Sequence, residues 1–227
     1  MTAPLDRVRQ DFDRIARALA AADAGDELPL YERALLAYVP RGAHVLEVGC
    51  GHGALTRRVA RRARSVLALD ISPRMIEVAR ARSSAHPNIA YRLADVTTAA
   101  LPEAAFDVVL SVATLHHVPL EPTVRRLAAA VRPGGVLLVQ DLLSRDGPRR
   151  APFDALAWIA RLLRGTPRGP RDPGARTIAK LYEEHGRGEQ YLTPAEAART
   201  YGEVLPGARV VPHIASRYTV VWRRRAD

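Results

Sequence analysis

The 227-residue chain has one cysteine, one lysine and few aromatic residues, which make up 5% of the sequence. The single cysteine, Cys50, excludes an internal disulfide and is typical of a protein that works in a reducing compartment. No apolar run reaches the roughly 18 residues that a membrane-spanning helix needs, and the N-terminus lacks the apolar core of a signal peptide. These absences predict a cytoplasmic protein without a membrane span.

The net charge of +10 comes almost entirely from arginine, because 34 basic residues include only one lysine, Lys180. A basic chain is a candidate for nucleic-acid binding. Here, however, the arginines accompany abundant alanine, which is typical of genome-wide base composition. The arginines that cluster at 57–64 lie opposite an inward apolar stripe and are interpreted as a solvated helix face. We therefore expect no nucleic-acid partner.

The most informative stretch is residues 45–56, VLEVGCGHGALT. An apolar run followed by Gly49, Gly51 and Gly53 and then by a helical pattern predicts a strand, a tight loop and a helix. Such glycines let a ligand approach the loop backbone, and the helix points its first N–H groups at that ligand. Glu47 lies inside the strand. A carboxylate there suits a positively charged ligand and disfavours a pyrophosphate.

Apolar runs alternate with helical patterns along most of the chain. The runs at 65–70, 89–93, 106–112 and 136–141 have the density of buried parallel strands, and helices are predicted at 73–83 and 122–131. A turn is predicted at 133–135, between the second of these helices and the last of these strands. Two strand-like runs close the chain at 208–214 and 217–222. The order predicts an α/β fold whose mostly parallel sheet ends in an antiparallel hairpin.

An acidic residue follows each of two predicted strands. Asp70 lies 21 residues after Gly49, near the ~20-residue spacing of a carboxylate that holds a ribose. A helix-capping role is the alternative, but Ser72 before a proline already supplies that cap. Asp95 is interpreted either as a turn aspartate or as a ligand to an adenine, and its place after Asp70 favours the ligand role.

The G-x-G-x-G loop, the two aspartates and the P-G-G turn, in this order, resemble the motifs of the class I S-adenosylmethionine (SAM)-dependent methyltransferases over residues 45–222. The resemblance implies a Rossmann-like seven-stranded sheet, mostly parallel, with a C-terminal antiparallel hairpin. We expect a single domain over 1–227, with N-terminal helices in 1–40. The segment 144–192, with helices near 153–163 and 175–184, is predicted to form a helical lid inserted after the fifth strand.

The resemblance also implies a role for each motif residue. The three glycines allow the backbone to pass close to the methionine and ribose of SAM, and Glu47 binds the methionine ammonium. Asp70 holds the ribose, and Asp95 with the backbone of Val96 reads the adenine edge. The predicted cofactor-binding residues are Glu47, Gly49, Gly51, Gly53, Asp70, Ile71, which lies against the adenine ring, Asp95, Val96 and Ser111, whose backbone accepts from the ammonium.

Two neighbouring histidines, His116 and His117, follow the fourth predicted strand and are the candidate catalytic residues. In this family the loop after that strand is near the transferred methyl group, where a base would serve a weakly acidic nucleophile. Adjacent side chains on a loop rarely point to one place, so we expect at most one to act as a base. The alternative is that one packs under the lid and the other bonds to backbone.

No spacing of histidine, cysteine and acidic residues indicates a metal, and none is expected. Cys50 is predicted to be a small packed residue, and His44 and His213 to be structural. His185 and Tyr182, in the predicted lid, are expected on an exposed helix surface, with a substrate-facing position as the alternative. His52, in the glycine loop, is expected near the cofactor without a chemical role.

The sequence thus predicts a SAM-dependent methyltransferase that acts on a small molecule in specialised or quinone-like metabolism. Methylation of oxygen, nitrogen or carbon stays open. The first alternative is a SAM-binding relative that catalyses a cyclisation or rearrangement without methyl transfer. The second is an RNA methyltransferase, motivated by the charge, although the chain has no appended RNA-binding module.

Overall fold

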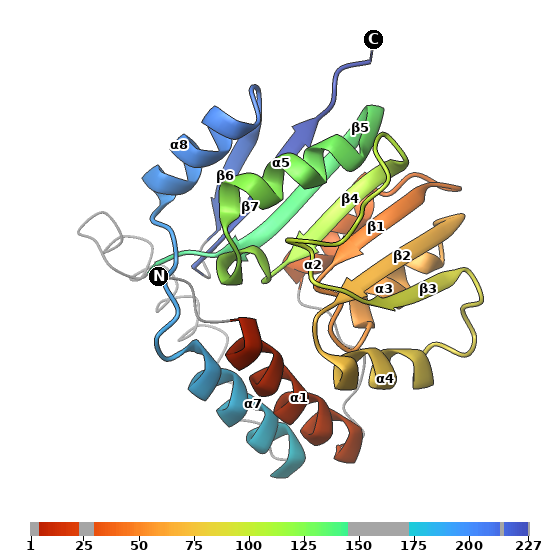
Figure 1. The fold of residues 1–227 in the computed structure, drawn as a ribbon, viewed down its shortest axis with the longest axis vertical. Coiled ribbons are helices and arrows are strands. Elements are labelled where there is room, and N and C mark those ends of the chain that lie inside the picture. The colour runs from red at the N-terminus through yellow and green to blue at the C-terminus, as the bar shows by residue number, and fades with distance from the viewer. Residues whose placement is uncertain (1–4, 23–29, 145–172, 214–215, 227) are drawn as a thin grey trace.

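The computed structural model describes residues 5–22, 30–144, 173–213 and 216–226. These residues form a seven-stranded sheet with the order β3-β2-β1-β4-β5-β7-β6 (Figure 1). Strands β1 to β5 are parallel, while β7 runs antiparallel to both β5 and β6. The strands are β1 (His44–Val48), β2 (Ser65–Asp70), β3 (Ile89–Leu93), β4 (Phe106–Val112), β5 (Val131–Leu142), β6 (Arg209–His213) and β7 (Arg217–Arg223).

The strand order reverses between β1 and β4. From β1 the chain moves outward through β2 and β3, and then it crosses back so that β4 pairs with the other side of β1, with Val48 opposite Ser111. In open parallel sheets such a reversal leaves a crevice outside the carboxyl ends of the two strands, where ligands bind. The topology therefore places a binding site beyond Val48 and Val112.

Helices cover both faces of the sheet because alternate residues of the central strands point to opposite sides. Leu46 and Val109 belong to one buried cluster, which includes α5 (Leu120–Ala130) and α8 (Pro194–Val204). Val45 and Val108 belong to a second, with α3 (Ala54–Ala60) and α4 (Pro73–Ala81). Short helices α2 (Leu30–Leu35) and η1 (Leu36–Tyr38) precede β1, and η2 (Leu115–His117) follows β4.

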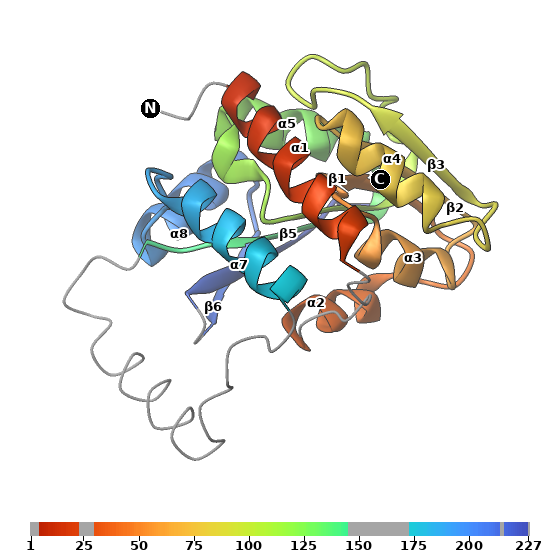
Figure 2. The same cartoon turned by 90° about the horizontal axis from the view of Figure 1, so that it is seen from below.

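Two helices distant in sequence, α1 (Leu5–Ala21) and α7 (Pro173–Gly186), lie side by side in both views (Figures 1 and 2). An ion pair joins Arg14 of α1 to Glu184 of α7 at 3.4 Å. At its other side α1 is bound to α4, since Arg82, the residue that caps α4, donates to the Leu19 carbonyl at 2.6 Å. The pair therefore forms a cover that is connected to the parallel part of the sheet through α4.

The predicted strands are confirmed, and their ends agree with the observed ones to within a few residues, except at the start of β5. The predicted turn at 133–135 is wrong, because β5 already begins at Val131 and its pairing with β4 is irregular between Phe106 and Val108. Gly134 lies in this irregular part of β5, and its φ of 77° is a backbone conformation that favours glycine. The helix predicted at 175–184 is observed as α7, whereas the one predicted at 153–163 lies outside the described residues.

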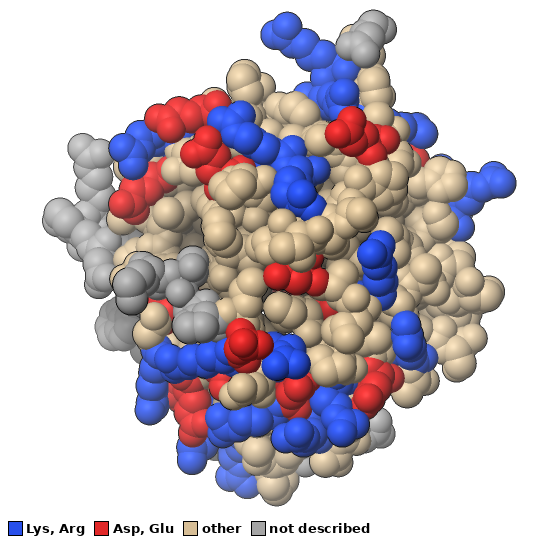
Figure 3. Space-filling view, in the orientation of Figure 1, with Lys and Arg blue, Asp and Glu red and all other residues tan. Residues whose placement is uncertain are grey.

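Charged side chains of both signs are interleaved over α1 and α7 on the face shown in Figure 3. Arg7 and Arg14 lie within 4.0 Å of Asp11, and Arg187 pairs with Glu183 at 2.9 Å. Within the described ranges, no helix combines the length and the apolar character that crossing a membrane requires.

Candidate active site

A cavity of about 620 Å³ opens at the carboxyl ends of β1, β2 and β4, at the reversal of the strand order. The cover contributes Phe12 from α1 and Tyr182 from α7 to its wall. The sheet side contributes the glycine loop and the strand ends. Sequence segments from both ends of the chain thus enclose one space large enough for a small-molecule ligand.

The structure gives a different reason for glycine at each position of the loop. Gly49 has φ at 74°, and a Cβ there would overlap the Thr114 side chain. Gly53, with φ at 81°, begins α3, and a Cβ there would collide with the Tyr91 hydroxyl. A Cβ at Gly51 would meet nothing within 4 Å. Gly49 and Gly51 line the cavity, whereas Gly53 does not, so the third glycine serves the packing of the loop.

Asp70 lies at the end of β2 with its carboxylate fixed by two backbone donors. Gly51 N donates to Asp70 Oδ2 at 2.8 Å, and Ser72 N donates to Oδ1 at 2.9 Å. Burial raises the pKa of Asp70, and these backbone hydrogen bonds oppose the increase. The capping role predicted for Ser72 is confirmed, since its hydroxyl accepts from Met75 N at 3.0 Å. Asp70 therefore does not cap α4 and lines the cavity.

Glu47 is a buried acid on the cavity wall, only 3% exposed. No described residue gives its Oε2 atom a hydrogen bond. Burial, and to a smaller extent the nearby carboxylates of Glu32 and Asp70, raise the pKa of Glu47 to about 8. A buried carboxyl group with an unsatisfied oxygen is costly unless a ligand pairs with it. Its surroundings therefore fit a cationic ligand group.

The remaining predicted cofactor residues divide into two groups. Ile71, Asp95 and Val96 line the cavity. Asp95 also forms the local turn that was the alternative interpretation, because its Oδ1 accepts from Thr97 N at 2.8 Å and from the Thr97 hydroxyl at 2.7 Å. Ser111 is fully buried, donates to the Val48 carbonyl at 3.1 Å and is absent from the wall, which at this point is formed by the next residues, 112–114.

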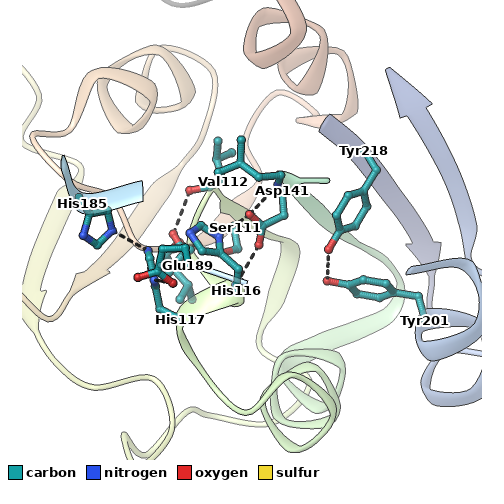
Figure 4. Close-up of polar contacts among 12 residues, drawn as sticks. Ser111, Val112, His116, His117, Asp141, His185, Glu189, Tyr201 and Tyr218 are labelled. Atoms are coloured by element: carbon teal, nitrogen blue, oxygen red, sulfur yellow. Dashed lines mark hydrogen bonds and ion pairs between the residues drawn. The ribbon is translucent and has the colours of Figure 1, made fainter. Parts of the chain in front are cut away.

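The structure brings His116 and His117 together, contrary to the expectation that they diverge. The two side chains lie next to each other in Figure 4, with their ring centroids 3.8 Å apart. Both residues line the cavity. His116 Nδ1 lies 2.6 Å from Asp141 Oδ1, and the His116 backbone N donates to Oδ2 at 3.1 Å. Asp141, at the end of β5, is 1% exposed. Because a carboxylate only accepts, this bond places a proton on Nδ1, so the neutral form of His116 has its lone pair on Nε2.

His117 lies beneath the cover and contacts α7. Its Nε2 is 3.4 Å from His185 Nε2, and its Nδ1 is 3.3 Å from Glu189 Oε2 (Figure 4). Burial, together with His116 and His185, lowers the pKa of His117 to about 2, so this imidazole is neutral. His185 Nδ1 in turn lies 3.1 Å from Asp11 Oδ2 of α1. The exposed position expected for His185 is wrong, because it is 9% exposed and lines the cavity.

Three residues of this site were missed by sequence analysis: Asp11, Asp141 and Glu189. No local pattern marks them, since each is distant in sequence from the histidine that it contacts. Tyr182 is 42% exposed, as expected, but also contributes to the cavity wall. The structural interpretation of His44 and His213 agrees with their hydrogen bonds to Ser65 and Thr219, both at 2.7 Å.

Comparisons with known proteins support the same interpretation. A model of the methyltransferase domain matches residues 46–139, from β1 to β5. An uncharacterised methyltransferase of Mycobacterium tuberculosis is 34% identical over 198 residues, which are 85% of this chain and 93% of the relative. A demethylmenaquinone methyltransferase of Tropheryma whipplei is 40% identical over 158 residues, covering 68% of this chain and 59% of the relative.

The fold has counterparts among solved structures as well. That of DhpI in complex with SAH has a TM-score of 0.61 at 22% identity and covers 96% of both chains. Three observations agree. They are the seven-stranded sheet with its closing antiparallel hairpin, the glycine loop after β1, and the similarity to a methyltransferase over most of the chain. The chain belongs to the class I SAM-dependent methyltransferases and uses SAM as its cofactor.

Proposed function

We propose that this enzyme transfers the methyl group of SAM to an oxygen, nitrogen or carbon atom of a small molecule in the cytoplasm. The observation that carries the proposal is the buried Glu47 carboxyl group, whose Oε2 has no partner among the described residues and which lines a cavity at the carboxyl edge of the sheet. The similarity to a demethylmenaquinone methyltransferase supports a small-molecule acceptor of the quinone-precursor class.

The cavity residues fit SAM group by group. Glu47 would bind the methionine ammonium, and the backbone at Gly49 and Gly51 would lie against the methionine and ribose. Asp70, held in place by Gly51 N and Ser72 N, would accept from the ribose hydroxyls. Ile71, Asp95 and Val96 would contact the adenine. Ser111 would contribute through its backbone, and Gly53 through the shape of the loop.

SAM supplies a methyl group on a sulfonium, which is already activated for displacement. The chain's main contribution is therefore to align the acceptor and to exclude water, and alignment can lower a barrier by roughly 7–11 kcal/mol. Phe12, Tyr182 and His185 of the cover close the cavity over the strand ends. This arrangement supports a lid role for α7, which belongs to the segment 144–192 predicted as a lid, and extends that role to α1.

We place His116 and His117 on the acceptor side of the cavity. The Asp141 carboxylate fixes the ring of His116 and leaves its Nε2 lone pair for chemistry. A neutral imidazole of this kind can accept a proton from a weakly acidic nucleophile, a contribution of about 10²–10⁴-fold in rate. Interleaved charges over the cover in Figure 3 favour a small acceptor over a nucleic acid, which would need a continuous basic surface.

The test has a binding arm and a transfer arm. Calorimetry measures SAM affinity for the wild type, for Asp70→Asn and for Asp6→Asn, an exposed aspartate of α1 that serves as control. We expect Asp70→Asn to weaken binding at least tenfold and Asp6→Asn to leave it unchanged. Methyl-labelled SAM incubated with a panel of hydroxylated aromatic, amine and quinol acceptors should yield labelled product and S-adenosylhomocysteine. Binding without any release of S-adenosylhomocysteine would contradict methyl transfer.

A further inference from the structure

Three side chains from two separate segments converge beside the cavity. His116 and His117 come from η2, and Glu189 follows α7. One ligand atom from each lies within 4.8 Å of the other two. Figure 4 shows the three side chains next to one another. Those of His117 and Glu189 are each only 5% exposed. Two imidazoles and a carboxylate at this spacing are a donor set that divalent transition metals use.

The contacts of the two histidines decide which of their nitrogens carry lone pairs. Asp141 accepts from His116 Nδ1, so His116 Nε2 is a lone-pair donor. His185, whose Nδ1 lies 3.1 Å from Asp11 Oδ2, places its Nε2 3.4 Å from His117 Nε2. His185 therefore occupies that side of the His117 ring, and His117 Nδ1 is the nitrogen that faces Glu189.

The contact between His117 and Glu189 leaves a buried polar atom unsatisfied. His117 Nδ1 lies 3.3 Å from Glu189 Oε2, yet among the described residues it has no hydrogen-bond partner. A buried carboxylate is costly unless a hydrogen bond or a positive charge stabilises it. Among the described residues, His117 is the one ionisable group paired with the Glu189 carboxylate. A cation between Nδ1 and Oε2 would satisfy both atoms.

We propose that His116 Nε2, His117 Nδ1 and the Glu189 carboxylate bind a divalent transition metal ion of the Zn²⁺ class. Two ligands about 2.0–2.1 Å from a tetrahedral ion are separated by about 3.3 Å, and His117 Nδ1 and Glu189 Oε2 are 3.3 Å apart. The two nitrogen donors disfavour Mg²⁺ and Ca²⁺, which prefer oxygen. Three protein ligands leave a fourth position, and both histidines line the cavity.

The surroundings have the form that supports metal-bound histidines. In metal sites the second nitrogen of a ligating imidazole usually donates to a carboxylate or another acceptor, which orients the ring. Asp141 is this partner of His116, at its Nδ1. His185, which contacts Asp11 of α1, lies against the second nitrogen of His117, its Nε2. In this way α1 and α7 would help to orient the His117 ring toward the metal.

If the enzyme transfers a methyl group as proposed above, a metal at this site narrows the class of acceptor molecules. The open position would take a hydroxyl oxygen of the acceptor, because a bound divalent ion lowers the pKa of a coordinated hydroxyl. With His116 Nε2 bound to the metal, the hydroxyl proton passes to solvent and not to His116. The O–C bond forms as the C–S bond of the sulfonium breaks, and a neutral thioether leaves. The inferred acceptor is thus a hydroxylated small molecule whose oxygen can bind a metal, and the product is a methyl ether.

The test measures metal binding without SAM or acceptor. The full chain, stripped with a chelator, is titrated with Zn²⁺ in competition with a chromophoric chelator, and Co²⁺ is added as a spectroscopic probe. We expect one equivalent of Zn²⁺ per chain and a visible Co²⁺ spectrum of a four- or five-coordinate site. Glu189→Gln and His117→Gln should each weaken Zn²⁺ binding at least tenfold, and His185→Gln should weaken it by about 10–100-fold.

His213→Gln is the matched control, because His213 bonds to Thr219 and does not line the cavity. The proposal is overturned if the wild type binds no stoichiometric Zn²⁺, if Glu189→Gln binds it as tightly as the wild type, or if His213→Gln causes an equal loss. Should Glu189→Gln fail to fold, His116→Gln and the wild-type Co²⁺ spectrum decide. SAM calorimetry on the same stripped protein separates the two proposals, since SAM binding without Zn²⁺ binding contradicts only the metal site.

Discussion

Asp13 of α1 accepts a 2.6 Å hydrogen bond from the Ser72 hydroxyl, the same hydroxyl that caps α4 by accepting from Met75 N. Arg74 N, in the first turn of α4, also lies 3.3 Å from Asp13 Oδ1. Ser72 N in turn donates to Asp70 at 2.9 Å. One carboxylate of the cover is therefore connected, through a single serine, to the carboxylate proposed to hold the ribose of SAM.

Replacing Asp13 with alanine should loosen both the cover and the cofactor site. A hydrogen bond to a charged group contributes about 1.5–3 kcal/mol, so we expect the free energy of unfolding in urea to fall by about this amount. The affinity for SAM should fall several-fold, because Ser72 loses the contact that holds it against α1. Asp6→Asn on the exposed side of α1 should change neither quantity, and an Asp13→Ala variant with unaltered SAM affinity would contradict the coupling.

Glu47 predicts a pH dependence of SAM binding. Its pKa is raised to about 8 in the folded protein, so it is protonated at pH 6, whereas pairing with the methionine ammonium requires the carboxylate. SAM binding therefore releases a proton, and the affinity should increase between about pH 6 and pH 8. Without SAM the sign for stability is opposite: the folded state holds a proton that the unfolded state has lost, so stability falls from about pH 4.5 to pH 8.

Glu47→Gln provides the check on this prediction. The variant should bind SAM more weakly at pH 8 and should lose the increase in affinity between pH 6 and pH 8. Calorimetry in two buffers of different ionisation enthalpy would also show whether the proton release disappears. Glu203→Gln, an exposed residue of α8, is the control. A wild-type affinity that is independent of pH over this range would exclude the proposed pairing.

The fold was predictable because its signals are local. Each parallel strand is a short apolar run, and residues 65–70, 89–93 and 106–112 were predicted with the observed ends. The start of α8 is also local, because Thr193 forms a capping box with Glu196 three residues later. The start of β5 was missed for a physical reason: Pro133 and Gly134 are turn residues by local preference, but pairing of Val131 with Phe106 places them inside a strand.

The cofactor side of the site was also predictable, since its residues come directly after strands and parallel strands end at one edge. The acceptor side was not. Asp141 and Glu189 contact histidines 25 and 72 residues away, respectively, and only the arrangement of β5 and of the segment after α7 brings them there. His185 was placed on a surface because an isolated helix pattern does not reveal that α1 covers it.

The two cavity-lining glycines should respond differently to alanine. Both have positive φ, 74° at Gly49 and 51° at Gly51, so each substitution costs roughly 1–2 kcal/mol in backbone strain. Only at Gly49 would the added Cβ also overlap Thr114. We expect Gly49→Ala to lose clearly more stability in urea unfolding than Gly51→Ala. Adding Thr114→Gly should recover part of the Gly49→Ala loss, and equal losses for the two single variants would contradict the overlap.

Asp141→Asn should separate catalysis from cofactor binding. Asp141 accepts from His116 N, from His116 Nδ1 and from its neighbour Leu142 N, and an amide with one oxygen cannot accept from all three. The ring of His116 would then lose its fixed tautomer, whether its Nε2 accepts a proton or binds a metal. We expect kcat to fall by about 10²-fold or more, with the SAM affinity within twofold of the wild type. Asp6→Asn is again the control, and since Asp141 is buried, circular dichroism must first show that the variant folds. An equal loss of SAM affinity would mean that Asp141 supports the whole cavity and not the acceptor side alone.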